Sequence, residues 1–274
     1  MTKLLENKVA IITGAARGIG QATAELFAQH GAKLVISDID PAPLNQAADT
    51  IEKCGGQVLA FPGDVTDPQF PDRLVKATLE KFGGLDIIVN NAGYTWDGVI
   101  HKMTDQQWQA IIDCHLTAPF RIIRAASSFI RETAKKEQAA QGRAQARKII
   151  CISSTSGTRG NAGQVNYSSG KSGVIGLAKT LAKEWGMFNV QANAVAFGWI
   201  NTRLTHAKEE QVKIKRENVE IELGIPSDRL QLMSKMIPLG RAGTPHEAAG
   251  AVLFFASPLS DYVSGQVLEV AGGM

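Results

Sequence analysis

The chain has 274 residues, of which 44% are hydrophobic and 20% are charged, and its formal net charge is +3. This size and apolar content predict one large core, and no linker divides the chain. Because the basic residues form no long cluster, we expect no nucleic-acid partner. No apolar run approaches the roughly 20 residues that span a bilayer, and the N-terminus has no secretory pattern. We therefore expect one cytoplasmic domain, residues 1–274, that has no membrane partner.

The three cysteines, Cys54, Cys114 and Cys151, lie far apart in the sequence. They show neither the spacing of metal ligands nor a pairing pattern, so we expect reduced, partly buried thiols and no metal site. Cys151 stands inside the apolar run 149–152, where a small hydrophobic side chain is sufficient.

Short apolar segments alternate with longer segments of helical length. The apolar segments are rich in β-branched residues and mostly continuous, as in strands that are covered on both faces. This alternation predicts a single-domain α/β Rossmann fold, which is a doubly wound, seven-stranded parallel sheet with helices on both faces. The predicted strands are Val9–Thr13, Leu34–Ser37, Val58–Phe61, Leu85–Asn90, Lys148–Ser153, Gln191–Ala196 and Val267–Val270, and the predicted helices include Gly18–His30, Pro68–Phe82, Asp105–Arg131 and Asn166–Trp185.

Two segments interrupt the alternation. Residues Arg131–Lys148 are rich in Ala, Gln, Lys and Arg and predict a helix that continues into solvent. Residues Thr202–Met236 follow the sixth strand, so they emerge at the carboxyl ends of the strands, where open α/β sheets bind ligands. This second segment fits either a lid inserted at about 202–236 or a solvated surface excursion. Its alternating charges predict a solvated helix: Lys208, Lys213, Lys215 and Arg216 are interleaved with Glu209, Glu210, Glu217, Glu220 and Glu222.

The first predicted strand ends in a glycine-rich turn, and a helix begins directly after it. Gly14, Gly18 and Gly20 allow a tight turn, a close approach of the backbone to a pyrophosphate, and close packing of the helix on the strand. The N-terminus of that helix offers N–H groups and a partial positive charge to phosphates. This strand–turn–helix context predicts a dinucleotide site.

Asp38 ends the second predicted strand. A carboxylate there can accept hydrogen bonds from the adenosine ribose and repel a 2′-phosphate, which favours NAD(H) over NADP(H); a cap of the next turn is the alternative role. Arg17 can reach a 2′-phosphate, so NADP(H) stays the alternative cofactor. Asp64 follows the third strand, from where it can hydrogen-bond the adenine edge while Val65 packs against the ring.

These residues resemble the short-chain dehydrogenase/reductase family over nearly the whole chain. The tail at 237–241, 264–266 and 272–273 looks like the branch that includes the 3-oxoacyl carrier-protein reductases, although alcohol, sugar and steroid dehydrogenases share it. The resemblance implies a homotetramer that buries the apolar helix Ala248–Ala256 and the segment Val267–Met274. The motifs that carry the resemblance are Thr13–Gly20, Asp64-Val65, Asn90-Asn91-Ala92-Gly93, Ser153-Ser154 and Tyr167-x-x-x-Lys171.

The resemblance also implies which residues line the site. Thr202 would contact the nicotinamide carboxamide, with Val195 and Ile200 near the same ring. Two positions depart from the family pattern: His115 stands where an asparagine usually helps to hold a water in the proton path, and Phe197 stands where proline is common. The implied cofactor residues are Gly14, Arg17, Gly18, Ile19, Gly20, Asp38, Asp64, Val65, Asn90, Asn91, Ala92, Gly93, Tyr167, Lys171, Gly198, Ile200 and Thr202.

The implied catalytic residues are Ser154, Tyr167, Lys171 and His115. Reduction of a carbonyl needs a proton for the oxygen, and lowering the pKa of a phenol from about 10 to about 7 requires roughly 4 kcal/mol of preferential stabilisation of the phenolate. Lys171 follows Tyr167 by one helical turn, so its ammonium and the oxidised nicotinamide can stabilise the phenolate. Ser154 can hydrogen-bond the reacting oxygen. The alternatives are a surface pair for Tyr167 and Lys171 and a strand-end cap for Ser154.

Two interpretations of His115 are open. A histidine with a pKa of about 6.5 suits a proton relay. A lone histidine in an apolar helix can instead be a packed residue that is bonded to a backbone carbonyl.

We expect an NAD(P)-dependent oxidoreductase that reduces a ketone, such as a 3-oxoacyl thioester on coenzyme A or a carrier protein, or that oxidises the matching secondary alcohol. Lys213, Lys215 and Arg216 can attract the phosphates or the acidic carrier of such a substrate. The alternatives are an NAD-dependent sugar, polyol or steroid alcohol dehydrogenase and a non-catalytic dinucleotide-binding module. The sequence has no Gly-x-Ser-x-Gly motif, which argues against a serine hydrolase.

Overall fold

A computed structural model describes residues 3–206, 213–216 and 219–274. Its main sheet has seven strands in the order β3-β2-β1-β4-β5-β6-β9, and all of their pairings are parallel. The order reverses between β1 and β4, which confirms the predicted doubly wound sheet. The strands are β1 (Val9–Thr13), β2 (Lys33–Ser37), β3 (Gln57–Ala60), β4 (Ile87–Asn90), β5 (Arg147–Ser154), β6 (Val190–Phe197) and β9 (Val267–Val270).

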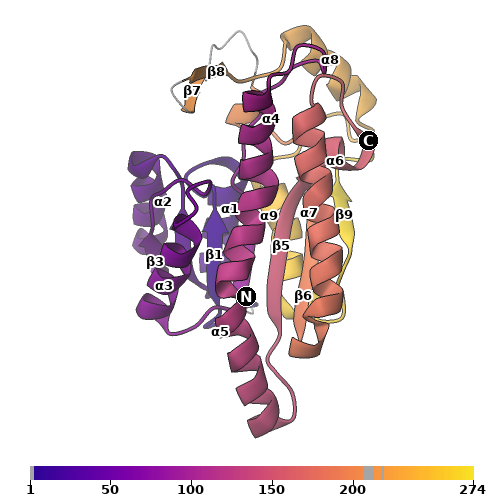
Figure 1. Cartoon of the computed structure of the whole chain (residues 1–274). Coiled ribbons are helices and arrows are strands. Elements are labelled where there is room, and N and C mark those ends of the chain that lie inside the picture. Colours follow the sequence, from indigo (N-terminus) through magenta and orange to yellow (C-terminus); the bar gives the residue numbers. More distant parts are fainter. Residues whose placement is uncertain (1–2, 207–212, 217–218) are drawn as a thin grey trace.

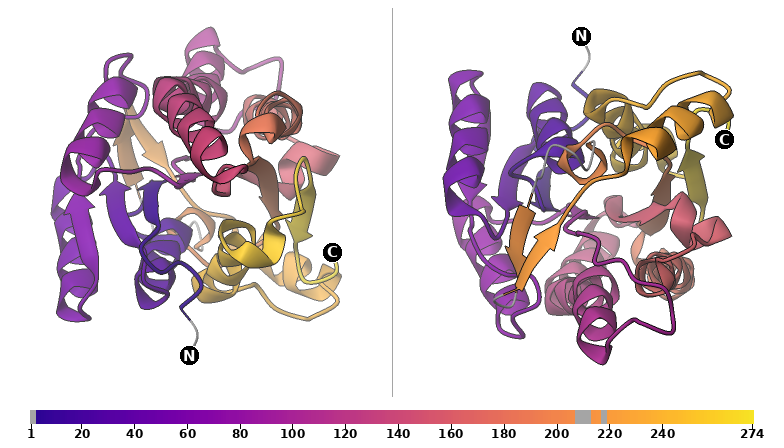
Figure 2. Two further views of the ribbon diagram at one scale, coloured as in Figure 1. Left: turned by 90° about the horizontal axis from the view of Figure 1, so that it is seen from below. Right: turned by 90° about the horizontal axis from the view of Figure 1, so that it is seen from above.

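Helices cover both faces of the sheet, as the end-on views in Figure 2 show. Successive strand residues alternate between two cores: Ile11 and Val35 lie in one, and Ile12 and Ile36 in the other. Both faces are therefore apolar, which explains the continuous apolar runs in the sequence. One face carries α1 (Gly18–Gln29), α2 (Pro41–Lys53) and α9 (Pro245–Ala256); the other carries α3 (Phe70–Phe82), α4 (Asp105–Ile112), α5 (Ala118–Gln141) and α7 (Val165–Glu184).

The apolar side chains of helix α9 are buried within this chain. It packs against α1, and Ala248, Val252 and Phe255 are buried in the second core. A capping box between Thr244 and Glu247 begins the helix. The apolar character of α9 therefore does not by itself require a partner, and the homotetramer stays a prediction.

The single helix predicted over Asp105–Arg131 is interrupted. A π-helical turn, η1 (Asp113–Thr117), separates α4 from α5. Helix α5 then continues to Gln141 and projects beyond the sheet in Figure 1, which confirms a helical extension in the first part of residues 131–148. The second part was wrong, because Arg147 and Lys148 begin β5 and are buried.

The segment 202–236, called the lid segment below, lies beyond the carboxyl ends of the strands (Figure 1). The solvated helix predicted there was wrong, because Lys213–Arg216 and Val219–Glu222 form the antiparallel strands β7 and β8. Ile214 and Ile221 face each other and are buried, so the hairpin packs inward through this pair. Lys208, Glu209, Glu210 and Glu217 lie outside the described residues. A 3-10 turn (Arg203–Thr205) precedes the hairpin, and α8 (Ser227–Met236) follows it.

Among the described helices, none combines the length and apolar character that a membrane crossing needs. A short helix, α6 (Thr155–Arg159), directly follows β5. Two further 3-10 turns are Gly186–Phe188 and Pro258–Ser260.

A buried ion pair joins the far end of α5 to β5 and provides a test of the fold. The Arg147 guanidinium, 4% exposed, donates to both carboxylate oxygens of Glu137 at 2.8 and 2.9 Å. We predict that Glu137→Ala lowers the free energy of unfolding by about 3 kcal/mol, because it leaves a buried charge unpaired. Glu132→Ala, at an exposed position on the same helix that pairs with Lys135, should cost at most about 1 kcal/mol. Denaturant unfolding of both variants measures the difference, and equal losses would contradict the prediction.

Candidate active site

One cavity of about 1100 Å³ opens at the carboxyl ends of the strands. The turns after β1 to β6 and the lid segment contribute to its wall. Every residue predicted for catalysis or cofactor binding lines it, with two exceptions.

Asn90 and Val195 are these exceptions. Asn90 is 5% exposed at the end of β4 and lines a small separate cavity beside Cys114, while its neighbour Asn91 faces the large one. Val195 is fully buried in the core under α9. Neither residue lines the large cavity as predicted, because Asn90 is still part of β4 and Val195 lies two residues before the end of β6, so the packed sheet encloses both side chains.

The glycine turn has the shape that a dinucleotide requires. Gly14 and Gly18 have φ angles of +64° and +59°, which favour glycine. A Cβ atom on Gly20 would lie 2.1 Å from the Gly14 carbonyl oxygen, so the helix reaches this position only with glycine. The Asn91 side chain donates to the carbonyl oxygens of Thr13 and Gly14, both at 2.9 Å, and holds the turn against β4. These residues fit a pyrophosphate on the N-terminus of α1.

Two carboxylates organise the end of the cavity beside β2. Asp38 accepts hydrogen bonds from the backbone N–H groups of Ala16 and Asp40, both at 3.1 Å, which fix its orientation. Arg17 donates to the Asp40 carboxylate at 2.9 Å, and Arg203 of the lid segment lies 4.0 Å from the same oxygen. Arg17 is therefore engaged by a carboxylate.

Asp64 lies beyond β3 with one carboxylate oxygen already bonded. That oxygen, Oδ1, accepts from the backbone N–H and the hydroxyl of Thr66 at 2.8 and 2.7 Å. Val65 is 8% exposed beside it. Both line the cavity, as expected for contacts to an adenine ring.

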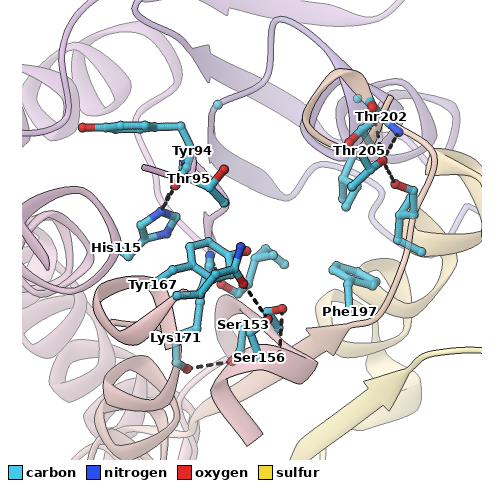
Figure 3. A pocket seen from close by; sticks show the side chains of 18 of the residues that line it. Tyr94, Thr95, His115, Ser153, Ser156, Tyr167, Lys171, Phe197, Thr202 and Thr205 are labelled. Carbon is cyan, nitrogen blue, oxygen red and sulfur yellow. Dashed lines mark hydrogen bonds between the residues drawn. The ribbon is translucent and has the colours of Figure 1, made fainter. Parts of the chain in front are cut away.

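Figure 3 shows Tyr167, Lys171 and His115 gathered on one side of the cavity, with Phe197, Thr202 and Thr205 across from them. The Lys171 Nζ donates to the Ile152 carbonyl oxygen at 2.7 Å and lies 5.6 Å from the centre of the Tyr167 ring. In turn the Ser153 hydroxyl donates to the Lys171 carbonyl oxygen at 2.7 Å, which ties α7 to the end of β5.

Burial disfavours charge on both catalytic candidates of α7. It raises the pKa of Tyr167 to about 12, opposed by a hydrogen bond with the Ser154 side chain, while the Asp97 charge adds to the rise. Burial also lowers the pKa of Lys171 to about 8. At neutral pH the phenol is thus protonated and the amine is mostly charged, which is the pair that a proton donor to a carbonyl requires.

His115 is 2% exposed, and its Nε2 lies 2.7 Å from the Tyr94 carbonyl oxygen. Burial and the nearby Lys171 charge hold its pKa well below the usual 6.5. The expected titration near 6.5 is thereby corrected, and the contact to a backbone carbonyl matches the packing interpretation.

Several residues on the substrate side were not predicted. Asp97 and Gln164 are hydrogen-bonded to each other at 3.0 Å, and Gln164 also accepts from the Ser156 hydroxyl. Gln164 is the N-cap residue of α7, three positions before Tyr167, so the start of that helix indicates its place in the site. The turn after β6, the lid segment and the C-terminus carry no comparable pattern. They contribute Trp199, Ile225, Leu232, Met233, Met236 and Met274 to the wall.

Comparison with known proteins places this site in a family. Residues 14–274 match a short-chain dehydrogenase/reductase family described as Enoyl-(Acyl carrier protein) reductase. The 3-oxoacyl-(acyl-carrier-protein) reductase FabG of Chlamydia muridarum is 38% identical over 275 residues, covering 100% of both chains. FabG of Vibrio cholerae is 38% identical and FabG of Escherichia coli K12 is 35% identical, each covering 98% of both chains. The chain therefore belongs to the short-chain dehydrogenase/reductase family of NAD(P)-dependent oxidoreductases.

Proposed function

We propose that this enzyme reduces the ketone of a 3-oxoacyl thioester, or oxidises the matching secondary alcohol, with Tyr167 as the acid/base. The observation that carries the proposal is the gathering of Ser154, Tyr167 and Lys171 on the wall of the same cavity as the glycine turn. The description of the matched family and the names of the relatives both refer to acyl groups on a carrier protein.

Each residue has a defined task in this proposal. A nicotinamide cofactor bound at the glycine turn would supply or accept the hydride. Tyr167 donates a proton to the carbonyl oxygen, and the Ser154 hydroxyl hydrogen-bonds the same oxygen and orients it. The Lys171 ammonium stabilises the phenolate that remains and can hold the ribose hydroxyls of the cofactor.

The substrate side favours a neutral, apolar acyl group. Met233, Met236 and Met274 line it, and methionine adapts to apolar groups of irregular shape. Asp97 lines the same cavity close enough to raise the pKa of Tyr167, so its charge would also repel an anionic substrate. A thioester is neutral beside its ketone, whereas a free 3-oxo acid carries a carboxylate there.

The hairpin gives little support to the idea that its basic residues attract the carrier. Lys213 pairs with Glu220 at 3.3 Å, and the register sets Lys213 against Glu222 and Lys215 against Glu220. Strand β7 is thus matched by an acidic strand, which lowers the local positive field. The proposal that the substrate is bound to a carrier protein or to coenzyme A therefore rests on the relatives' names and on the apolar wall of the cavity.

We further propose that the enzyme is a cytoplasmic homotetramer. We also propose that the lid segment closes over the substrate. The family resemblance supports the tetramer. The lid role is supported by Ile225, Met233 and Met236, which line the cavity from that segment.

The proposed preference for NAD(H) rests on Asp38 and Asp40. Asp38 lines the cavity with its carboxylate held by two backbone N–H groups, and Asp40 occupies Arg17. A 2′-phosphate would meet two carboxylates before it could bind an arginine.

The proposed function is tested by comparing substrates. The N-acetylcysteamine thioester of a 3-oxo acid should show a higher kcat/KM than the free acid, a sugar ketone or a steroid ketone, measured by oxidation of NADH. It should also exceed the kcat/KM of a polyol, measured in the opposite direction by reduction of NAD+. Asp97→Asn should reduce the gap between thioester and free acid. Preferred turnover of a polyol or steroid would favour the alternative dehydrogenases, and cofactor binding without turnover of any substrate would indicate a binding module.

Tyr167→Phe should lower kcat by about 10²–10⁴-fold, because only the proton donor is removed. Binding of NADH, followed by its fluorescence, should be nearly unchanged. A variant that keeps more than about a tenth of the activity would contradict the role of the hydroxyl.

Asp38→Asn should reduce the preference for NADH over NADPH by about tenfold or more. The preference is the ratio of the two dissociation constants, and a tenfold change in it corresponds to about 1.4 kcal/mol. Asparagine keeps one oxygen, which can accept from the Ala16 N–H, but it removes the charge and the second acceptor, which receives the Asp40 N–H. Fluorescence titration with each cofactor measures the ratio, with Asp67→Asn, a carboxylate outside the cavity that pairs with Arg73, as the control. An unchanged ratio would mean that the Asp38 charge does not select the cofactor.

A further inference from the structure

The imidazole of His115 joins two parts of the active site. His115 lies in the π-helical turn between α4 and α5, and such turns are frequent at functional sites. Its side chain lies between the loop after β4 and helix α7. Figure 3 shows it beside Tyr167 and below Tyr94.

Two glycines make room for this ring. A Cβ atom on Gly93 would lie 2.2 Å from His115 Cε1, and one on Gly170 would lie 3.0 Å from His115 Cβ. The imidazole also meets the Tyr167 ring edge-on, with the ring centres 5.0 Å apart and an interplanar angle of 83°. The ring therefore fixes the spacing between Gly93, which lines the cavity, and Tyr167.

The hydrogen bonds of His115 assign its tautomer. A carbonyl oxygen only accepts, so the 2.7 Å contact with Tyr94 requires a proton on Nε2. The Tyr94 backbone N–H also faces Nε2, at a longer 3.3 Å. It could donate there only in the other neutral tautomer, whose Nδ1 proton would be buried without a partner among the described residues. Nδ1 is buried and has no hydrogen-bond partner among the described residues, so a second proton there would be unsatisfied. The ring is thus neutral and protonated on Nε2.

This arrangement does not support the proton relay. A relay needs a partner that gives a proton and another that receives it. Nε2 faces a carbonyl oxygen, and Nδ1 is closed off from solvent. The low pKa, caused by burial and Lys171, further removes charge from His115 at neutral pH.

We propose that His115 is a positioning residue: its Nε2–H bond to the Tyr94 carbonyl and its edge contact with Tyr167 hold the phenol against the Gly93–Tyr94 loop. The proposal rests on the acid/base role of Tyr167 given above. Loss of the bond would let the loop and the phenol shift relative to each other, and misplacement by about 1 Å can cost up to about 100-fold in rate.

Paired substitutions separate the bond from the packing. His115→Gln keeps a side-chain N–H donor, whereas His115→Leu keeps apolar bulk without one. We expect the Leu variant to lose roughly 10- to 100-fold in kcat, with KM for the cofactor little changed, and the Gln variant to recover most of that loss. His101→Leu, at an exposed histidine outside the cavity, is the control and should keep full activity. Wild-type kcat in the Leu variant, or equal losses in the Leu and Gln variants, would overturn the proposal.

A measurement on the unmodified enzyme does not depend on how the variants fold. Nitrogen-15 NMR of the histidines should show His115 protonated on Nε2, unprotonated on Nδ1, and not titrating between pH of about 6 and 8. Titration in that range, or a proton on Nδ1, would overturn the proposal. If no substrate is turned over, the proposed function fails, and the NMR signals still decide the state of His115.

Discussion

A parallel sheet that is covered on both faces is the constraint on which this molecule depends. Strand side chains must be apolar on both sides, because each side meets a core. Polar side chains can therefore gather only where strands end, and parallel strands end on the same edge. That is why the glycine turn, Asn91, Ser154 and Gly198 meet in one cavity although they lie far apart in the sequence.

The same burial shapes the chemistry of the site. It raises the pKa of Tyr167 and lowers the pKa of Lys171 and His115, so it opposes charge on all three. Because burial raises the pKa of Tyr167 to about 12, the pKa must be lowered further for catalysis than that of an ordinary phenol. The Ser154 hydrogen bond provides part of this lowering. In the proposed mechanism the rest would come from the Lys171 ammonium and from the positive ring of an oxidised cofactor, and the acidity of Tyr167 would then depend on cofactor state.

The sequence predicts best those features in which burial directly determines the type of residue. All seven strands of the main sheet were predicted within two residues at each end, because a continuous apolar run has one explanation in this fold. The glycine turn was equally clear, since a Cβ atom at Gly20 would strike the Gly14 carbonyl. Contacts between residues that lie apart in the sequence cannot be predicted from local patterns. No local sequence pattern indicates that Arg147 pairs with Glu137 or that Arg17 pairs with Asp40.

The hairpin shows a different limit. Its many charges were interpreted as one face of a helix, while the alternation of Lys213, Ile214 and Lys215 already had the period of a strand. The π-helical turn was missed as well, because Asp113–Thr117 continues the apolar periodicity of its neighbours. Its consequence is large, since it contains the histidine that touches Tyr167.

Cofactor and substrate sites differ in how strongly the fold constrains them. The cofactor turn is fixed by backbone approach, and only glycine satisfies it. The lid segment contacts the glycine turn through Thr202, which faces Gly18, and Arg203 approaches Asp40. The rest of the segment needs only apolar side chains toward the cavity. Met233 and Met236 supply such side chains without any periodic requirement, and the charged strands of the hairpin keep their ion pair, Lys213 with Glu220, exposed. Substrate choice therefore depends on the side chains that the fold constrains least, which is why a site that predicts its reaction so clearly predicts its substrate only by class.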